Sequence, residues 1–344
     1  MNIRTVLEKM IAARASDLHL KAGTPPVVRV DGVLYTLDEP PPSAQQLRDV
    51  CNQLLNEEQR LYFSTHNEID FAFGVSGLAR FRANIFMQRG TVALALRHVP
   101  VEVPSIEDLK LPNVVRELAF SPRGLVLVTG RTGSGKSTTL AAMIDAINKV
   151  TTRNIITVED PIEFLHRDRL SFIHQREVGL DTRSFHDGLR YVLRQDPDVI
   201  LVGEMRDLET IRLALTGAET GHLVFGTLHT SSAAKTIDRI VDVFPAAEKE
   251  MVRAMLSESL RAVISQTLLK RIGGGRLAAH EIMIGTPAIR NLIREGKIAQ
   301  MYSSIQTGQA AGMQTLDQCL KELLQKGMIT KEEARYRAQN KDDF

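Results

Sequence analysis

The pattern of apolar positions in the first hundred residues indicates a small domain of mixed strands and helices. Residues 27–37 read VVRVDGVLYTL, and Asp31-Gly32 can supply the positive φ angles of a tight turn, so a β-hairpin is predicted. A helical stretch is expected over residues 43–63, after a proline cluster. Strands are predicted over IDFAFGV, ARFRANIFMQ and TVALALRHV. The N-terminal 17 residues are predicted to form an amphipathic helix with an apolar stripe of Ile3, Val6, Leu7 and Met10.

The spacing of apolar residues along the chain changes after Leu125. Apolar runs typical of buried strands (LVLVT, NIITVE, DVILVGE and HLVFGTLHT) alternate with helical stretches, which is the signature of a parallel sheet flanked by helices. A long helix is expected over residues 246–271, followed by the turn GGGR and shorter helices to the end. The sequence therefore predicts an α/β protein with an N-terminal α+β domain (1–98), a proline-punctuated linker (99–112) and a larger domain (113–344).

Length and composition agree with two globular domains and a cytoplasmic protein. The 344 residues exceed the usual size of one hydrophobic core, and the net charge is only +2. Aromatic residues make up 5% and Trp is absent, which disfavours nucleic acid as a partner. The two cysteines, Cys51 and Cys319, lie too far apart for a zinc knuckle. No signal-peptide core is present and no apolar run approaches ~20 residues, so we expect no membrane insertion.

A phosphate-binding loop follows the strand LVLVT. Residues 130–137 read GRTGSGKS, which fits GxxxxGK[ST], and the helix-forming TTLAAMIDAI comes next. The alternative is a chance glycine-rich turn with a surface lysine, but such a turn would not have to lie between a strand and a helix. The glycines let backbone N–H groups surround phosphates, Lys136 reaches the β- and γ-phosphates of ATP, and the Ser137 hydroxyl can ligate Mg²⁺. The predicted ATP-binding residues are Gly130, Thr132, Gly133, Ser134, Gly135, Lys136, Ser137 and Thr138.

Carboxylates end two other predicted strands. In DVILVGE the usual acidic position is Gly203, so Glu204 is the carboxylate left to polarise water or hold the water shell of a metal. In ITVEDPIE, Glu159 or Glu163 could act on the metal or the water, and we assign Glu159 to the metal with Ser137. The alternative for each is a solvated or capping carboxylate.

Two histidines lie at opposite ends of the run HLVFGTLHT. A histidine on an apolar strand is more often structural, and this alternative stays open for His222. His229 is followed by Thr230 at the strand end, where it could sense the γ-phosphate.

Taken together, GRTGSGKSTT, ITVEDPIEF, DVILVGEMRDLETIR and GHLVFGTLHT resemble the Walker A, Asp box, Walker B and His box of the secretion and pilus ATPases. ASDLHL, VVRVDG and ARFRAN resemble the N-terminal PAS-like domain of that superfamily. AHEIMIGTPAIRNLIRE and GMQTLDQCL are similar to the C-terminal region of type IV pilus retraction ATPases. One departure is Arg131, where the family commonly has proline.

The resemblance implies a RecA-like ATPase domain, a hexamer and catalytic use of Glu204, Glu163 and His229. It also implies that Arg82 and Arg97 of the N-terminal domain reach the nucleotide, although both could be ordinary exposed strand arginines. The expected partner is an inner-membrane platform protein of the pilus (PilC-type), which would make the chain peripheral at the inner membrane. We expect ATP to close the two domains about the linker and hydrolysis to reopen them.

Other functions stay open at this point. An extension ATPase of the same superfamily generally carries extra N-terminal domains and a four-cysteine metal site, which are not found here. An accessory retraction ATPase differs in its C-terminal region. A nucleic-acid-stimulated RecA-like motor and a ring subunit that binds ATP without turnover are the alternatives from other classes.

Overall fold

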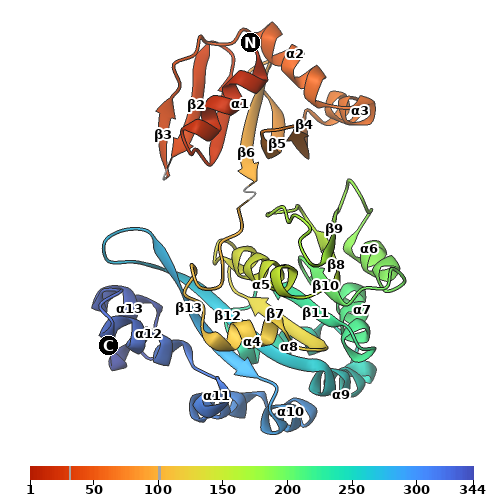
Figure 1. The fold of residues 1–344 in the computed structure, drawn as a ribbon, viewed down its shortest axis with the longest axis vertical. Helices are drawn as coiled ribbons and strands as arrows, with labels where there is room; N and C mark the ends of the chain where they lie inside the picture. The colour runs from red at the N-terminus through yellow and green to blue at the C-terminus, as the bar shows by residue number, and fades with distance from the viewer. Residues whose placement is uncertain (31, 100–101) are drawn as a thin grey trace. The chain divides into compact units, whose positions relative to one another are not determined.

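The computed structural model describes residues 1–30, 32–99 and 102–344. Asp31, which we expected in the hairpin turn, and Pro100, which we expected in the linker, lie outside the described residues. The chain divides into two compact units, Met1–Glu102 and Val103–Phe344, which are labelled by element in Figure 1.

The N-terminal unit is an antiparallel sheet with strand order β3-β2-β1-β6-β5-β4. Its apolar side chains form one core that includes Leu7 of the first helix, Leu47 of the second and Phe81 of the sheet. The elements are α1 (Ile3–Ala12), β1 (Asp17–Lys21), β2 (Thr24–Val30), β3 (Val33–Thr36), α2 (Ala44–Leu54), α3 (Glu57–His66), β4 (Glu68–Val75), β5 (Ala79–Gln88) and β6 (Thr91–Val99).

The predicted elements of this unit are confirmed, with two differences. The N-terminal helix is shorter than predicted, because α1 ends at Ala12 and Asp17 begins strand β1. Helix α1 buries Val6, Leu7 and Met10, and β2 pairs antiparallel with β3 as the hairpin predicted. The helical stretch expected over 43–63 is two helices, because Asn56 begins a second helix with its own capping box.

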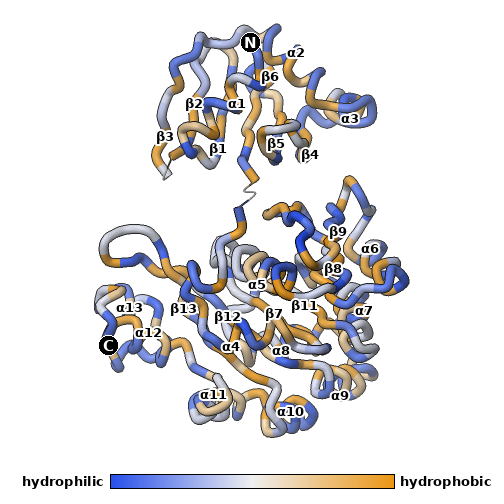
Figure 2. Tube along the Cα trace, viewed as in Figure 1, coloured by the Kyte–Doolittle hydropathy of each residue, from blue (hydrophilic) through white to orange (hydrophobic). Residues whose placement is uncertain are grey.

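The C-terminal unit contains a sheet with strand order β13-β12-β7-β11-β10-β8-β9. Its strands are parallel except β13, which pairs antiparallel with β12. Figure 2 shows the central strands as predominantly hydrophobic, as expected for strands with both faces covered. The strands are β7 (Gly124–Thr129), β8 (Asn154–Glu159), β9 (Phe172–Glu177), β10 (Val199–Val202), β11 (Leu223–Leu228), β12 (Leu260–Lys270) and β13 (Arg276–Ile284).

Helices cover both faces of this sheet, and each face has its own apolar core. One core contains Val115 and Met143 from two helices of one face, and the other contains Leu189, Ile211 and Ile237 from helices of the opposite face. The helices are α4 (Asn113–Ala119), α5 (Lys136–Val150), α6 (Phe185–Val192), α7 (Leu208–Glu219), α8 (Ala233–Asp242), α9 (Lys249–Ser259), α10 (Pro287–Arg294), α11 (Met301–Thr307), α12 (Leu316–Gln325) and α13 (Lys331–Arg337).

The long helix expected over 246–271 is wrong in its second half. Helix α9 ends at Ser259, and residues 260–270 form β12, which pairs with β7. The segment after the GGGR turn is a further strand, β13, before the short helices begin. A strand that is buried on both faces lacks the alternation of polar and apolar residues that distinguishes a strand from a helix. For this reason residues 260–270 were predicted to be helical.

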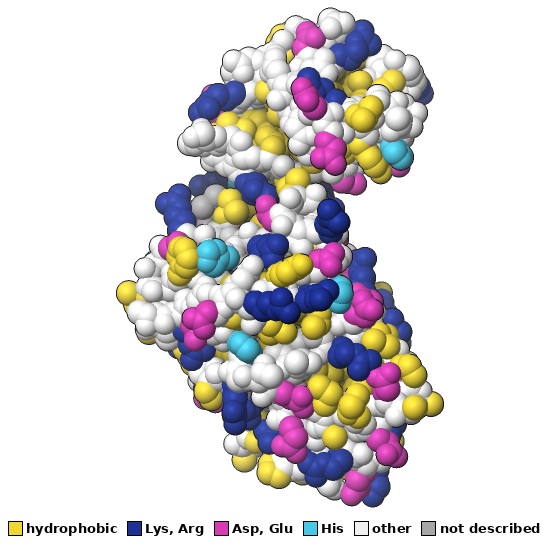
Figure 3. Space-filling model, turned by 90° about the vertical axis from the view of Figure 1, so that its right-hand side faces the viewer, with side chains coloured by type: hydrophobic (Ala, Val, Ile, Leu, Met, Phe, Trp, Pro, Cys, Tyr) yellow, Lys and Arg dark blue, Asp and Glu magenta, His cyan; other side chains and the backbone are white. Residues whose placement is uncertain are grey.

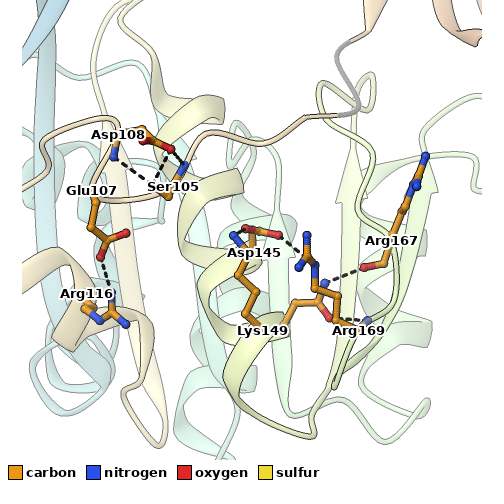
Figure 4. Close-up of polar contacts among 9 residues, drawn as sticks. Ser105, Glu107, Asp108, Arg116, Asp145, Lys149, Arg167 and Arg169 are labelled. Atoms are coloured by element: carbon orange, nitrogen blue, oxygen red, sulfur yellow. Dashed lines mark hydrogen bonds and ion pairs between the residues drawn. The ribbon is translucent and has the colours of Figure 1, made fainter.

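The residues after Glu102 pack with the C-terminal unit. Ile106 and Leu111 are buried in the core that also contains α4 and α5. Ser105 and Asp108 exchange hydrogen bonds in a short turn, and Glu107 pairs with Arg116 of α4 (Figure 4).

Among the described residues, none of the helices is both long enough and apolar enough to cross a bilayer. Figure 3 shows acidic and basic side chains interspersed on the face drawn.

Candidate active site

The loop between β7 and α5 has the backbone of a phosphate-binding loop. Gly130, Gly133 and Gly135 have φ angles of 144°, 78° and 89°, a region that glycine occupies without strain. A Cβ on Gly130 would collide with the carbonyl oxygen of Gln266 and the side chain of Ser134. Thr132 and Gly133 are exposed, whereas Ser137 and Thr138 at the start of α5 are half-buried. The loop therefore presents the N-terminus of α5, where backbone N–H groups favour anions.

Lys136 is buried beside two carboxylates. Its Nζ donates to the carbonyl oxygens of Gly130 (2.9 Å) and Arg131 (3.3 Å) within the loop. Burial lowers the pKa of Lys136, and the negative charges of Glu204 and Glu163 partly oppose this effect. Lys136 thus shares one electrostatic environment with both predicted catalytic glutamates.

Gln266 on β12 holds the loop in place, and the sequence analysis missed it. Its Nε2 donates to the carbonyl oxygen of Ser134 (2.7 Å), and its Oε1 accepts a hydrogen bond from Thr139 of α5 (2.8 Å). Gln266 is itself buried. The sequence signal for Gln266 is a polar residue within an apolar run. We predicted that run to be helical, whereas it forms the strand beside β7.

Glu204 lies just beyond the end of β10. Its Oε1 contacts Nε2 of His229 at 2.8 Å and Nε of Arg206 at 2.6 Å. The side chain of Glu204 is 16% exposed, so it is largely shielded but still open to solvent on one side. The hydrogen bond and the charge of Glu204 raise the pKa of Arg206. Arg206 is a second residue of this site that the sequence analysis did not single out.

Glu159 and Glu163, the two candidate carboxylates at and beyond the end of β8, have different surroundings. Glu159 ends the strand and accepts hydrogen bonds from Thr157 Oγ1 (2.7 Å) and Gln175 Nε2 (3.3 Å). Burial raises the pKa of Glu159 despite these hydrogen bonds, and the charge of Glu163 adds to the increase. Glu163 is exposed on the loop beyond the strand.

A small cavity of about 30 Å³ joins these elements. Ser137, Glu159, Glu163, Gly203 and Thr227 contribute to its wall. Mg²⁺ is usually held by one or two protein oxygens together with waters and substrate phosphates, and the Ser137 hydroxyl and Glu159 carboxylate fit that donor set. Within the described residues, no group of three or more His, Cys, Asp or Glu could hold a metal by itself.

The two histidines of HLVFGTLHT have separate surroundings. His229 follows β11 at the end where Glu204 lies, and its side chain is 43% exposed. His222 precedes β11, and its Nδ1 lies 2.9 Å from the carbonyl oxygen of Gly217 and 3.2 Å from Thr220 Oγ1. The contacts of His222 therefore lie at the C-terminal end of α7.

The loop that follows Glu163 is anchored to α5. Asn148 donates through Nδ2 to the carbonyl oxygen of Arg167 (2.7 Å) and accepts through Oδ1 from the N–H of Arg169 (3.0 Å). Figure 4 shows the Arg169 side chain directed toward Asp145, which also pairs with Lys149 at 2.5 Å. The helix that begins with Lys136 thus also supports the segment that carries Glu163.

Arg82 and Arg97 belong to the N-terminal unit. They are directly opposite each other on β5 and β6, and both are exposed. Arg97 Nε pairs with Asp17 Oδ1 at 2.8 Å. Arg82 and Arg97 therefore lie side by side on one face of the sheet, and Asp17 offsets part of the charge of Arg97.

Comparison with known proteins places these features in one family. The family described as Type II/IV secretion system protein matches residues 2–274. The chain is 59% identical to the type IV pilus retraction ATPase PilT of Pseudomonas aeruginosa over the full length of both. It is 41% identical to the type IV pilus ATPase PilU of the same organism, over 100% of this chain and 90% of PilU.

The fold is similar to a crystal structure of the pilus retraction motor PilT with bound ADP. The TM-score is 0.94 at 50% identity, and the match covers 100% of this chain and 99% of that one. The family match, the full-length identity and the phosphate-binding loop agree, and the chain belongs to the Type II/IV secretion system protein family.

Proposed function

We propose that this protein is an ATP-hydrolysing motor that powers the retraction of type IV pili. The observation that carries this proposal is the group formed by the phosphate-binding loop, Lys136, Glu204 and His229 at one edge of the sheet. The PilT protein of known structure binds ADP, and full-length identity of 59% to a pilus retraction ATPase supports the same activity in this chain.

Each residue of the group has a distinct role in this proposal. The N–H groups of residues 130–138 hold the phosphates, and Lys136 neutralises charge on the β- and γ-phosphates. Glu204 polarises the attacking water, with Glu163 as a second acidic partner. His229 contacts Glu204 and senses the γ-phosphate.

The Ser137 hydroxyl and the Glu159 carboxylate would hold Mg²⁺, directly or through its waters. When bound, Mg²⁺ would supply positive charge that stabilises the phosphates during transfer. Glu159 is suited to a fixed position because Thr157 and Gln175 both donate to its carboxylate.

Arg82 and Arg97 are proposed to donate to the nucleotide from the N-terminal domain. Charge built up on the transferred phosphoryl group would attract them, so ATP binding would close the two domains and product release would reopen them. In this proposal domain 1–98 moves on domain 113–344. Within the predicted linker 99–112 the hinge is its N-terminal part, because Ile106 and Leu111 are buried in the core of the C-terminal unit.

We further propose that six copies form a ring and that the ring acts on an inner-membrane platform protein of the pilus (PilC-type), at the cytoplasmic face of that membrane. Domain closure in one subunit would then pass to its neighbour through the ring contacts. The higher identity to PilT (59%) than to PilU (41%) favours the principal retraction motor over the accessory one.

The chemical proposal is tested by Glu204→Gln. We expect phosphate release to fall by about 10²–10⁴-fold because the amide cannot polarise water as a carboxylate does. Binding of fluorescent ADP should change little, because the phosphates are held by the loop and Lys136. Glu250→Gln, on an exposed position of α9, is the matched control. An undiminished rate in Glu204→Gln would remove this residue from the chemistry.

The biological proposal is tested by deleting the gene and counting surface pili. Abundant pili without twitching motility support retraction, whereas loss of pili would indicate extension. Stimulation of ATP turnover by DNA or RNA would instead favour the nucleic-acid motor.

A further inference from the structure

Glu281 is a buried carboxylate that has no part in the chemistry described so far. It lies on β13 and is 3% exposed. One oxygen, Oε1, accepts the backbone N–H of Ala233 at 2.7 Å. The other, Oε2, accepts Nε2 of Gln339 at 3.3 Å. Burial raises the pKa of Glu281, and the two hydrogen bonds oppose that change.

The contact with Ala233 places this carboxylate at the N-terminus of α8. Ala233 is the first residue of the helix, and Ser232 is its N-cap. The N–H groups of a first helical turn have no partner within the helix, and the helix dipole there favours negative charge. A buried carboxylate is tolerated at this point because it accepts a hydrogen bond from a helix N–H group and places negative charge at the positive end of the helix dipole. The Glu281 contact therefore holds the start of α8 against β13.

The start of α8 in turn holds the segment that carries His229. Only residues 230–232 separate His229 from Ala233. Thr230 Oγ1 lies 2.7 Å from Thr236 Oγ1, and Thr236 also donates to the carbonyl oxygen of Ser232 (2.8 Å). A shift of the first turn of α8 therefore carries His229 with it, and His229 is the residue that contacts Glu204 at 2.8 Å.

Packing alone does not restrain this segment on all sides. Ser231, Ser232, Arg131 and Glu281 line one cavity of about 670 Å³. A segment that borders a cavity has fewer packing partners on that side, so its hydrogen bonds contribute more to its position. The hydrogen bond from the Ala233 N–H to Glu281 joins this segment to β13.

The second oxygen of Glu281 extends the link to the C-terminal residues. Asp317 of α12 accepts the backbone N–H groups of Gln339 (2.8 Å) and Asn340 (2.9 Å). Asp317 is 5% exposed, so the carboxylate that accepts these two hydrogen bonds is largely shielded from water. The Gln339 side chain thus connects an anchored C-terminal segment to the carboxylate that holds α8.

We propose that Glu281 is a positioning residue for His229 and that Gln339 makes this positioning depend on the C-terminal segment. Glu281 acts through the first turn of α8 and does not touch the nucleotide. The proposal rests on the function proposed above, since it concerns the same hydrolysis site.

Glu281→Ala and Glu281→Gln test the first part. We expect Glu281→Ala to lower kcat for ATP hydrolysis by about tenfold or more, because a small displacement of a site residue is costly to the chemical step. The KM for ATP and the affinity for fluorescent ADP should stay within about twofold, because the phosphate-binding loop is unchanged. Glu281→Gln keeps a carbonyl oxygen for the Ala233 N–H, and its amide N–H can donate to the side-chain oxygen of Gln339 once the Gln339 amide turns over, so this variant should recover most of the loss. Glu322→Ala, an exposed carboxylate on α12, is the matched control.

Gln339→Ala tests the second part and replaces an exposed residue, so the variant should fold. We expect faster amide hydrogen exchange over residues 229–236 and a kcat lower by about two- to fivefold, a smaller loss than in Glu281→Ala. If Glu281→Ala fails to fold, Gln339→Ala and Glu281→Gln still decide the proposal through this exchange measurement, with Glu281→Gln expected to exchange as the wild type does.

Three results would overturn the proposal: a wild-type kcat in folded Glu281→Ala, equal losses in the Ala and Gln variants, or wild-type exchange in Gln339→Ala. These results differ from failure of the proposed function, which would appear as absence of ATP turnover in the unaltered chain.

Discussion

Nε2 of His229 lies 2.8 Å from Oε1 of Glu204, although 24 residues separate them in the chain. Both follow the carboxyl ends of adjacent parallel strands, β10 and β11, which pair Val202 with Gly226. Parallel pairing places the residues beyond two such ends at the same edge of the sheet. This contact joins the segments that resemble the Walker B and His boxes.

Replacing His229 by Ala should lower kcat for ATP hydrolysis by about 10- to 100-fold, because Glu204 loses a partner that orients its carboxylate. Affinity for fluorescent ADP should be retained, since Lys136 and the loop are unchanged. Phosphate release and ADP titration measure the two effects. His222→Ala, at the other end of β11, is the comparison and should retain most of the activity; a wild-type rate in His229→Ala would refute the assigned role.

Gly130 and Gly133 should differ in their tolerance of Ala. Both have positive φ, but a Cβ on Gly130 meets Gln266 and Ser134, whereas a Cβ on Gly133 has nothing within 4 Å. Gly133→Ala should cost about 1–2 kcal/mol of loop strain, and Gly130→Ala should also displace the loop from β12. Titration with fluorescent ADP should show the larger loss of affinity in Gly130→Ala. Equal affinities would show that the close approach to Gln266 is unimportant.

Gly203→Ala should impair the site although it adds only a methyl group. The new Cβ would lie 3.1 Å from Glu159 Cα and from the carbonyl oxygen of Val158, which is tighter than ordinary contact. We expect a loss of about 1–3 kcal/mol in stability. Displacement of Glu159 should also raise the Mg²⁺ concentration needed for half-maximal ATP hydrolysis. The thermal midpoint and a Mg²⁺ titration test this, and an unchanged Mg²⁺ requirement would argue against Glu159 as a metal partner.

Acidification should destabilise the C-terminal unit through His280. Burial lowers its pKa from 6.5 to about 4, and its Nε2 has no hydrogen-bond partner among the described residues. Between these two pH values the unfolded chain binds a proton that the folded chain does not, so stability falls as the pH falls through this window. The loss approaches about 1.4 kcal/mol per pH unit within it and is absent well above pH 6.5.

His280→Phe should therefore show a shallower decrease of thermal midpoint between pH 7 and pH 4 than the wild type does. The comparison is of slopes, so a change in stability at neutral pH does not affect it. His174→Gln, at an exposed position, is the control and should keep the wild-type slope. Parallel curves for His280→Phe and the wild type would contradict the assignment.

Local sequence signals predict some elements of this fold and miss others. The hairpin, helix α1 and strands β7, β8, β10 and β11 were predicted because turn residues and apolar periods are local signals. Strand β12 was assigned to a helix because its run is buried on both faces, and the role of Gln266 was lost with it. Arg206 was missed because an arginine beside a strand end has no distinctive pattern until its partner is known.

The sequence by itself determined the phosphate-binding loop, since glycines with positive φ, a lysine and a serine at the start of a helix act within eight consecutive residues. Only the tertiary structure decided which distant side chains meet that loop. The contacts of His229 with Glu204, of Gln266 with Ser134 and of Glu281 with Ala233 depend on strand order and register, which are set by the packing of the whole sheet and not by any local pattern.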